Sequence, residues 1–370
     1  MKVLFFVDRM RVGGIQTLLV NIFRHLDYGM INCELLLLDD GEHYKLEDIV
    51  ANMGVKVYKL NNVWLRKPHD YIKYRKAVDT FFSLHHDYQV IHMNSGPKNA
   101  YILKKAKEYK IPVRIAHSHN SNYQTKSIMQ RLIGNIMKIS LRKNANVYLA
   151  CSDYAAKWMF GTDSRHAIIL PNGIDLDDFE YNVRVRREIR AELGIEENAI
   201  VIGNVGRFTP QKNHERIVRI FSEFLKYKPD SYLVLAGIGE LLEATKSLVL
   251  YYGIQDRVKF LGFRNDVKSL IQGMDLFLMP SLYEGFPVTA VEAQASGLPC
   301  VFSDTITRNV KIMDNVKYVS LNESDSTWIS EMIESLSIFD RTESVHVLKE
   351  KGYDINDMIN KLMLIYQSCG

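Results

Sequence analysis

The sequence predicts an α/β protein with two doubly wound domains in series, each a parallel sheet covered by helices. Three observations lead to this fold class. The chain has 370 residues, more than one hydrophobic core usually organises. Short apolar runs alternate along nearly the whole chain with longer segments of helical periodicity. The short runs are apolar throughout rather than at every second residue, as in strands buried on both faces of a parallel sheet.

The predicted strands form two series along the chain. The first series is Lys2–Val7, Cys33–Leu38, Val55–Tyr58, Gln89–Met93, Val113–His117, Val147–Ala150 and Ala167–Leu170. The second series is Ile200–Val205, Tyr232–Ala236, Val258–Leu261, Leu276–Met279 and Cys300–Ser303. Helical spacing of apolar residues between the strands supplies the covering helices.

The domain boundary is predicted from turn residues. Pro171-Asn172-Gly173 is a turn sequence that ends the first series. We therefore expect an N-terminal domain over residues 1–170 and a second domain over residues 171–354. Apolar residues at helical spacing from Ile355 to Tyr366 predict a final helix within residues 355–370.

Composition excludes several classes of protein. Hydrophobic residues make up 47% and charged residues 24%, as in ordinary globular proteins. The net charge of +4 argues against a nucleic-acid binder. Four widely separated cysteines form no zinc or disulfide pattern and fit a reducing cytoplasm. No apolar run reaches the roughly 18 residues that span a bilayer, and the apolar start is too short for a signal peptide.

The charge is divided unevenly between the two halves. Residues 1–170 hold 25 Lys and Arg against 14 Asp and Glu, a net +11, and residues 171–370 hold 22 against 29, a net −7. Part of the basic excess lies in Lys126–Lys143, where cations interleave with apolar residues at helical spacing. Two interpretations stay open: an amphipathic helix on an anionic membrane, or a core-packed helix with a solvated basic face.

The densest candidate site is residues 280–299, which follow a buried strand and so lie at the carboxyl edge of the second sheet. Pro287 suits the first position of a helix and Gly297 the residue just past its end. Glu284 before the helix and Glu292 within it could each accept hydrogen bonds from paired sugar hydroxyls. The alternative is two surface glutamates, which leaves Gly285-Phe286-Pro287 unexplained.

Two other loops carry candidate phosphate contacts. In Gly206–Asn213, Arg207 and Lys212 could bind a diphosphate and Asn213 could cap the next helix, although two ordinary solvated cations would give the same pattern. Gly13 and Gly14 follow the first strand and permit close approach of a ligand. A dinucleotide fingerprint is absent there, and Leu242 replaces the third glycine after Gly237-Ile238-Gly239, which disfavours an NAD-dependent oxidoreductase.

His117 and His119 end a predicted strand, and strand alternation points both to one side. Two such imidazoles could be a metal pair, but no third ligand can be placed near them from sequence. Two roles remain open for each histidine: hydrogen bonding to the substrate, or a purely structural role. Asp175-Leu176-Asp177 matches a loose metal-transferase pattern but lies in an acidic stretch that favours a solvated loop.

Together, Gly13-Gly14, His117, Arg207 with Lys212, and the two glutamates of PSLYEGFPVTAVEAQASGLP resemble retaining glycosyltransferases of the GT-B fold, family 4 (group 1). The resemblance covers essentially the whole chain in order, with LPNGID at Leu170–Asp175. The run Ala295–Thr307 is similar to bacterial capsule and exopolysaccharide transferases.

This resemblance implies two facing Rossmann-like domains and a C-terminal helix that crosses back to the first. It implies that Arg207 and Lys212 neutralise the leaving diphosphate and that Glu292 holds the ribose. The hexose contacts it implies are Glu284, the backbone of Gly285, Phe286 and Pro287, and His117. Further contacts it implies are Gly14 with diphosphate or acceptor, Phe263 and Arg264 with the nucleobase, and Gly13 and His119 with acceptor or sugar.

The implied activity is metal-independent, cofactor-free transfer of a hexose or N-acetylhexosamine from a nucleotide sugar, UDP by preference, to a saccharide acceptor. A lipid-linked acceptor would place the basic N-terminal domain peripherally on the inner face of the cell membrane. A sugar-nucleotide epimerase and a non-catalytic sugar-binding subunit are the alternatives. Nucleic acid is not an expected partner.

Overall fold

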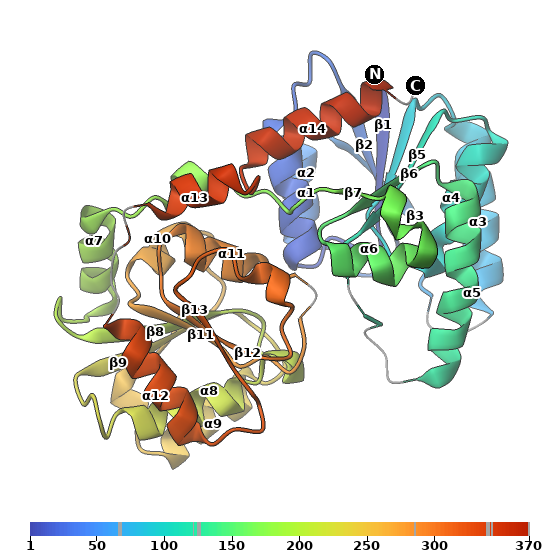
Figure 1. Cartoon of the computed structure of the whole chain (residues 1–370). Coiled ribbons are helices and arrows are strands. Elements are labelled where there is room, and N and C mark those ends of the chain that lie inside the picture. Colours follow the sequence, from blue (N-terminus) through green and yellow to red (C-terminus); the bar gives the residue numbers. More distant parts are fainter. Residues whose placement is uncertain are drawn as a thin grey trace. The chain divides into compact units, whose positions relative to one another are not determined.

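The computed structural model describes residues 1–65, 69–120, 122–123, 127–284, 286–337, 341 and 343–368. The chain divides into two compact units, Met1–Ile174 with Asp354–Gly370, and Asp175–Tyr353. Each unit holds one parallel sheet with helices on both faces (Figure 1). The predicted fold class, two doubly wound Rossmann-like domains, is therefore confirmed.

The first sheet has seven strands in the order β3-β2-β1-β4-β5-β6-β7. Its strands are β1 (Lys2–Val7), β2 (Asn32–Leu38), β3 (Lys56–Leu60), β4 (Val90–Met93), β5 (Val113–Ser118), β6 (Val147–Ala150) and β7 (Ile168–Ile169). All neighbours pair in parallel, so every strand ends at the same edge. The strand order reverses between β1 and β4, and at such a switch point α/β sheets bind ligands.

The helices of the first unit cover the two faces of this sheet (Figure 1). On one face lie α1 (Gly14–His25), α2 (Lys45–Asn52) and α14 (Ile355–Ser368), and on the other α3 (Asp70–Leu84), α4 (Ala100–Glu108) and α5 (Ile128–Asn144). Helix α6 (Asp153–Phe160) follows β6. Buried apolar side chains of β1, β2, α1 and α14 form one continuous core.

The second sheet has six strands in the order β10-β9-β8-β11-β12-β13. They are β8 (Ile200–Val205), β9 (Ser231–Ala236), β10 (Val258–Phe260), β11 (Leu276–Met279), β12 (Cys300–Ser303) and β13 (Val316–Val319). Its helices are α7 (Val183–Leu193), α8 (His214–Phe224), α9 (Leu242–Tyr251), α10 (Val267–Gln272), α11 (Val288–Ala295), α12 (Asp325–Leu336) and α13 (Ser344–Glu350). The switch point here lies between β8 and β11.

The C-terminal helix α14 belongs to the first unit, as predicted. Its side chains Ile355, Met358 and Leu362 are buried in the core beneath β1 and β2. The two chain segments that join the units run side by side, because Ile174 and Asp354 form a parallel bridge. The carbonyl of Ile174 accepts a hydrogen bond from the amide of Ile355 at 3.0 Å, which ties the start of α14 to the end of the first series of strands.

Strand β13 was not predicted. It is the last strand in the order of its sheet and pairs with β12. Val316 and Val319 are buried, but Lys317 and Tyr318 between them are half-buried. A short edge strand of mixed polarity lacks the continuous apolar run that marks the other strands.

Candidate functional site

Two loops meet at the switch point of the second sheet. The loop after β8 carries Arg207 and Lys212, and the loop after β11 carries Glu284, so both leave the carboxyl edge from neighbouring strands. Lys212 Nζ lies 2.7 Å from Glu284 Oε1, and both side chains are largely buried. Gln211 Nε2 donates to Glu284 Oε2 at 2.9 Å. The structure thus brings together two motifs that lie more than 70 residues apart in the sequence.

The loop after β9 supports the Arg207 loop. A Cβ atom at Gly237 would lie 1.9 Å from the carbonyl oxygen of Gly206, and one at Gly239 would lie 2.4 Å from that of Phe208. The amide of Phe208 donates to Ile238 O at 3.0 Å. These glycines therefore serve close backbone packing behind the candidate site, a role that the incomplete dinucleotide pattern did not suggest.

Helix α11 begins one residue later than predicted. Pro287 is its N-cap residue and Val288 its first helical residue, while Phe286 stacks on Tyr353 with ring centroids 6.2 Å apart. Gly285 lies outside the described residues. Gly297 (φ 69°) ends the helix as expected, with the amides of Gly297 and Leu298 bonded to the carbonyls of Gln294 and Ala293 in a Schellman motif.

Glu292 lies in the second turn of α11. The side chain is partly exposed, yet burial by the surrounding protein raises its pKa to about 7. Near neutral pH the carboxyl group therefore changes between a hydrogen-bond donor and an acceptor-only carboxylate. Either form can contact a hydroxyl pair, but the ionised form accepts both hydrogen bonds.

Asn213 does not play its predicted capping role, and Arg264 is held by neighbouring carboxylates. Asn213 stands at the N-cap of α8, but its side chain makes no capping hydrogen bond and Nδ2 instead donates to Pro280 O at 3.0 Å. The backbone of Asn213 has φ 55°, in the left-handed region, whereas a capping residue normally has an extended backbone. Arg264 bonds Asp266 at 2.7 Å and Glu192 at 2.5 Å, so two carboxylates hold its guanidinium. Phe263 is 41% exposed.

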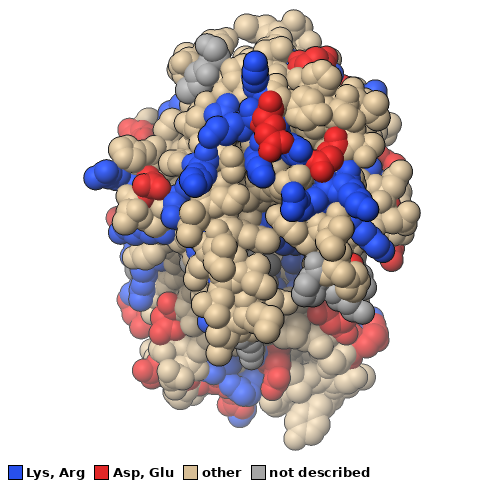
Figure 2. Space-filling view, turned by 90° about the vertical axis from the view of Figure 1, so that its right-hand side faces the viewer, with Lys and Arg blue, Asp and Glu red and all other residues tan. Residues whose placement is uncertain are grey.

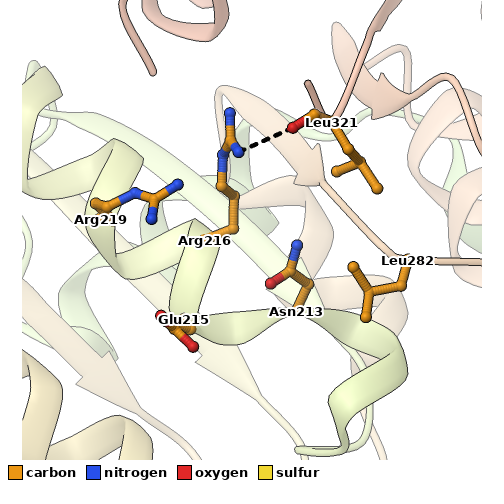
Figure 3. Close-up of a pocket in the computed structure, with 6 residues that line it drawn as sticks. All are labelled: Asn213, Glu215, Arg216, Arg219, Leu282 and Leu321. Carbon is orange, nitrogen blue, oxygen red and sulfur yellow. Dashed lines mark hydrogen bonds between the residues drawn. The ribbon is translucent and has the colours of Figure 1, made fainter. Parts of the chain in front are cut away.

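A pocket of about 190 Å³ lies beside the candidate site (Figure 3). Asn213, Glu215, Arg216, Arg219, Leu282 and Leu321 line it. Arg216 donates to Leu321 O at 3.1 Å and pairs with Asp325, which also pairs with Arg219. Two carboxylates, Asp325 and Glu215, thus offset the two guanidinium groups of this pocket, so its lining carries no excess positive charge.

In the first unit, the loop between β1 and α1 is anchored at its start. The carboxylate of Asp8 accepts hydrogen bonds from Asn99 Nδ2 at 2.7 Å and from Ser95 Oγ, and lies 2.6 Å from Lys98 Nζ. Helix α1 begins at Gly14 with no capping side chain and no acid in its first turn. A Cβ at Gly13 would lie 2.8 Å from Gln16 Oε1. This helix start follows the carboxyl end of β1, which lies next to β4 at the switch point of the sheet.

Three buried histidines lie at the end of β4 and β5. The rings of His117 and His119 are 4.0 Å apart, which confirms that both point to one side of the sheet. His92, which was not predicted as a site residue, places Nε2 3.0 Å from His117 Nδ1. Its Nδ1 lies 2.7 Å from Tyr366 Oη of α14. His119 Nε2 lies 2.9 Å from Asn94 Oδ1.

Burial keeps these histidines uncharged. It lowers the pKa of His92 to about 3 and of His119 to about 4, and it lowers the pKa of His117 well below its usual range. Among the described residues, no group of three or more His, Cys, Asp or Glu side chains is arranged to hold a metal ion. At neutral pH the three rings act as hydrogen-bonding groups.

The predicted basic helix is α5, and its exposed face is apolar. Ile128, Met129, Leu132, Ile133, Ile136 and Ile139 are between 41% and 75% exposed. Lys138 is buried over the rings of Tyr123 and Trp158, and this burial lowers its pKa to about 8. Lys126 lies outside the described residues. The core-packed interpretation is therefore wrong, because the apolar side chains of α5 face outward.

Comparisons with known proteins match both units. Residues 12–178 match the family model "Glycosyltransferase Family 4" and residues 185–354 match "Glycosyl transferases group 1". The putative glycosyltransferase EpsF of Bacillus subtilis is 29% identical and covers 99% of this chain and 96% of its own. An Escherichia coli UDP-Gal:α-D-GlcNAc-diphosphoundecaprenol α-1,3-galactosyltransferase is 34% identical over 43% of this chain and 42% of its own.

Solved structures agree on the fold. Anabaena HepE in complex with UDP has a TM-score of 0.80 at 18% identity and covers all of both chains. WaaG, a glycosyltransferase of lipopolysaccharide biosynthesis, has a TM-score of 0.73 at 17% identity and covers 99% of both chains. The two family matches, in the predicted order and over both units, show that the chain belongs to the GT-B glycosyltransferases of family 4 (group 1), which are retaining and metal-independent enzymes.

Proposed function

We propose that the chain transfers a hexose or N-acetylhexosamine from a UDP-sugar to a lipid-linked saccharide during the synthesis of bacterial surface polysaccharide. The observation that carries the proposal is the cluster of Gln211, Lys212 and Glu284 at the switch point of the second sheet. Arg207 lies on the same loop as Lys212, and Glu292 lies on helix α11, which follows the Glu284 loop. Solved relatives of the same fold contain UDP and UDP-glucose, which supports a UDP donor.

Arg207 and Lys212 are proposed to stabilise the diphosphate as the bond to the anomeric carbon breaks. Negative charge grows on the leaving oxygen, and preorganised cations with helix-end amides stabilise it. The aliphatic part of Lys212 lies over Gly206, where a Cβ would come within 3.2 Å of its Cε, so the side chain is held along the sheet edge. Glu284 keeps its amine in place through the 2.7 Å contact.

The sugar and ribose contacts are assigned to the glutamates. We propose that Glu284 and the amides at the start of α11 contact hexose hydroxyls and that Glu292 accepts hydrogen bonds from the ribose diol. His117 and His119 are proposed to contact the transferring sugar or the acceptor, and Gly13 and Gly14 to offer backbone amides to phosphate or acceptor. Phe263 with the backbone of Arg264 would contact the nucleobase.

A lipid-linked acceptor is proposed from two observations. The E. coli relative in the comparisons acts on a diphosphoundecaprenol-linked sugar, by its name. The first unit also presents the exposed apolar face of α5, bordered by exposed Arg131 and Lys143 and by Lys104, Lys107 and Lys110 at α4. In Figure 2, Lys and Arg (blue), with some Asp and Glu (red) among them, lie above and beside a tan stretch on the side where α3, α4 and α5 lie.

An apolar face ringed by cations matches the interfacial region of an anionic bilayer. None of the described helices has the length and apolar character needed to cross a bilayer. We therefore propose that α5 lies in the plane of the membrane, with its isoleucines among the acyl chains and the surrounding cations at the headgroups. This would bring the active site to its lipid-borne substrate.

Donor choice is tested by thermal shift of the purified protein with UDP, GDP and ADP. We expect UDP to raise the melting temperature most, and Arg207→Ala and Lys212→Ala to reduce that shift without unfolding the protein. Lys246→Ala is the control, since Lys246 pairs with a neighbour on its own helix, Glu243, at 2.8 Å. If GDP or ADP raised the melting temperature more than UDP, the donor would carry that nucleotide instead of UDP. Isomerisation of the donor in the absence of any acceptor would indicate an epimerase instead.

A further inference from the structure

A buried hydrogen-bonded chain runs from the last helix to the edge of the first sheet. Tyr366 Oη of α14 lies 2.7 Å from His92 Nδ1, and His92 Nε2 lies 3.0 Å from His117 Nδ1. All three side chains are at most 1% exposed. The far nitrogen of His117, Nε2, is also buried and has no partner among the described residues.

The direction of this chain follows from the number of protons available. A neutral imidazole carries one N–H, so each histidine donates at one nitrogen and accepts at the other. If the Tyr366 hydroxyl donates to His92 Nδ1, then His92 donates from Nε2 to His117 Nδ1. His117 must then carry its own proton on Nε2.

The opposite direction leaves a proton without an acceptor. His117 would donate from Nδ1 to His92 Nε2, and His92 would donate from Nδ1 to Tyr366 Oη. The phenol proton would then need a second acceptor, and Tyr366 Oη contacts none other among the described residues. The first direction leaves one buried group without a partner among the described residues, the N–H at His117 Nε2, whereas the opposite direction leaves two, the Tyr366 O–H and the unprotonated His117 Nε2. Each such group is costly, so the first direction is favoured.

We propose that Tyr366 and His92 are positioning residues that hold the His117 proton on Nε2, so that His117 donates a hydrogen bond to an oxygen of the bound saccharide. This rests on the proposed contact between His117 and the sugar. His117 then acts as a neutral donor, neither a base nor a cation. Burial of all three groups agrees, because it lowers the pKa of both histidines and raises that of the Tyr366 hydroxyl.

The proton position can be measured without any substrate. In protein labelled with ¹⁵N-histidine, the long-range ¹H–¹⁵N spectrum distinguishes protonated from unprotonated ring nitrogens, and the His117→Gln spectrum assigns the ring. We expect Nε2 of His117 to be protonated in the wild type and the two nitrogens to exchange roles, or to average, in Tyr366→Phe. A wild-type ring protonated on Nδ1 would overturn the proposal.

The rate of sugar transfer tests whether this proton position matters for catalysis. Tyr366→Phe keeps the packing of α14 but removes the hydroxyl, and we expect kcat/KM for sugar transfer to fall about tenfold, the effect of one hydrogen bond. Affinity for UDP should not change, since His117 is proposed to contact the sugar and not the UDP part of the donor. Tyr88→Phe is the matched control. Tyr88 also donates a buried hydrogen bond, to Glu34 at 2.5 Å, but it does not belong to the series Tyr366–His92–His117.

His92 offers a test by rescue. The side-chain amide of His92→Gln can still donate to His117 Nδ1, whereas His92→Leu cannot, so the first variant should retain more activity at equal melting temperature. Equal activity of both variants, or of Tyr366→Phe and wild type, would refute the positioning role. If the wild-type protein transfers no sugar, the proposed function fails, and the ¹⁵N spectrum still decides the proton position.

Discussion

Replacing two side chains on the exposed face of α5 tests its role as a membrane-binding surface. Leu132 and Ile136 are 59% and 67% exposed and lie one helical turn apart. Full burial of such a side chain is worth about 1.5–3 kcal/mol, so the exposed part of each contributes about 1–2 kcal/mol on entering the acyl region. Leu132→Gln with Ile136→Gln should therefore weaken membrane partitioning by about 2–4 kcal/mol.

This loss is large enough to measure. At about 1.4 kcal/mol per tenfold, the double variant should bind vesicles of phosphatidylglycerol and phosphatidylethanolamine about 30-fold to several hundredfold more weakly in sedimentation assays. Its melting temperature should change by no more than about 1–2 °C, because neither side chain packs into the core. Glutamine preserves helix propensity, so the helix itself should remain.

A matched substitution in the other unit provides the control. Leu250 of α9 is 64% exposed, and Leu250→Gln should leave vesicle binding unchanged. Arg131→Glu with Lys143→Glu should weaken binding to anionic vesicles and reduce its dependence on salt, at about 1 kcal/mol per cation. Unaltered sedimentation of the double glutamine variant, or equal binding of wild type to neutral and anionic vesicles, would refute the reasoning.

Three further outcomes follow from the second unit. Glu292 has a pKa near 7 and is proposed to accept from the ribose as a carboxylate, so donor KM should fall up to about tenfold as pH rises from 6 to 8, and Glu292→Gln should abolish that dependence in initial-rate assays. Gly297→Ala should lower the free energy of unfolding in urea by about 1–3 kcal/mol, because φ is 69° and the new Cβ would lie 2.7 Å from Arg341 Cα. Asp275→Ala should cost about 3–5 kcal/mol in the same measurement, since it leaves the buried Arg190 guanidinium, now 2.5 Å from Asp275, without its carboxylate. No loss in either substitution would contradict the packing described for it.

Most of the fold could be predicted because the buried strands of a parallel sheet are continuous apolar runs in the sequence. Strands β1, β8, β11 and β12 have the predicted bounds, and all are buried interior strands. The edge strand β13 was not predicted because half of its side chains are partly exposed to solvent. Sequence periodicity thus identifies what is buried on both faces and misses what lies at an edge.

The candidate site was predicted in part. Lys212 and Glu284 each follow a strand that ends at the same sheet edge, so topology alone brings them together. His92 and Tyr366 were missed because they lie 274 residues apart, and nothing local marks either as a partner of His117. A polar residue near the end of a buried strand was the one available signal for His92.

Helix α5 shows the limit of amphipathic patterns. The spacing of its isoleucines predicted the helix correctly but could not say which face would be covered. Tyr123 packs on Gly134, where a Cβ would lie 2.6 Å from its ring, and with Trp158 it encloses Lys138 on the inner side. This inversion, cation inside and isoleucines outside, depends on tertiary contacts that the pattern does not contain.

The central claim is that the Lys212 cluster stabilises the leaving nucleotide during sugar transfer. Its most direct test is the rate of transfer of labelled sugar from a panel of UDP-sugars to lipid-linked saccharide, compared among wild type, Lys212→Ala and Lys246→Ala. We expect transfer by wild type and by Lys246→Ala, and a loss of about 10²- to 10³-fold in Lys212→Ala at an unchanged melting temperature. Near-wild-type transfer by a folded Lys212→Ala protein would contradict the account.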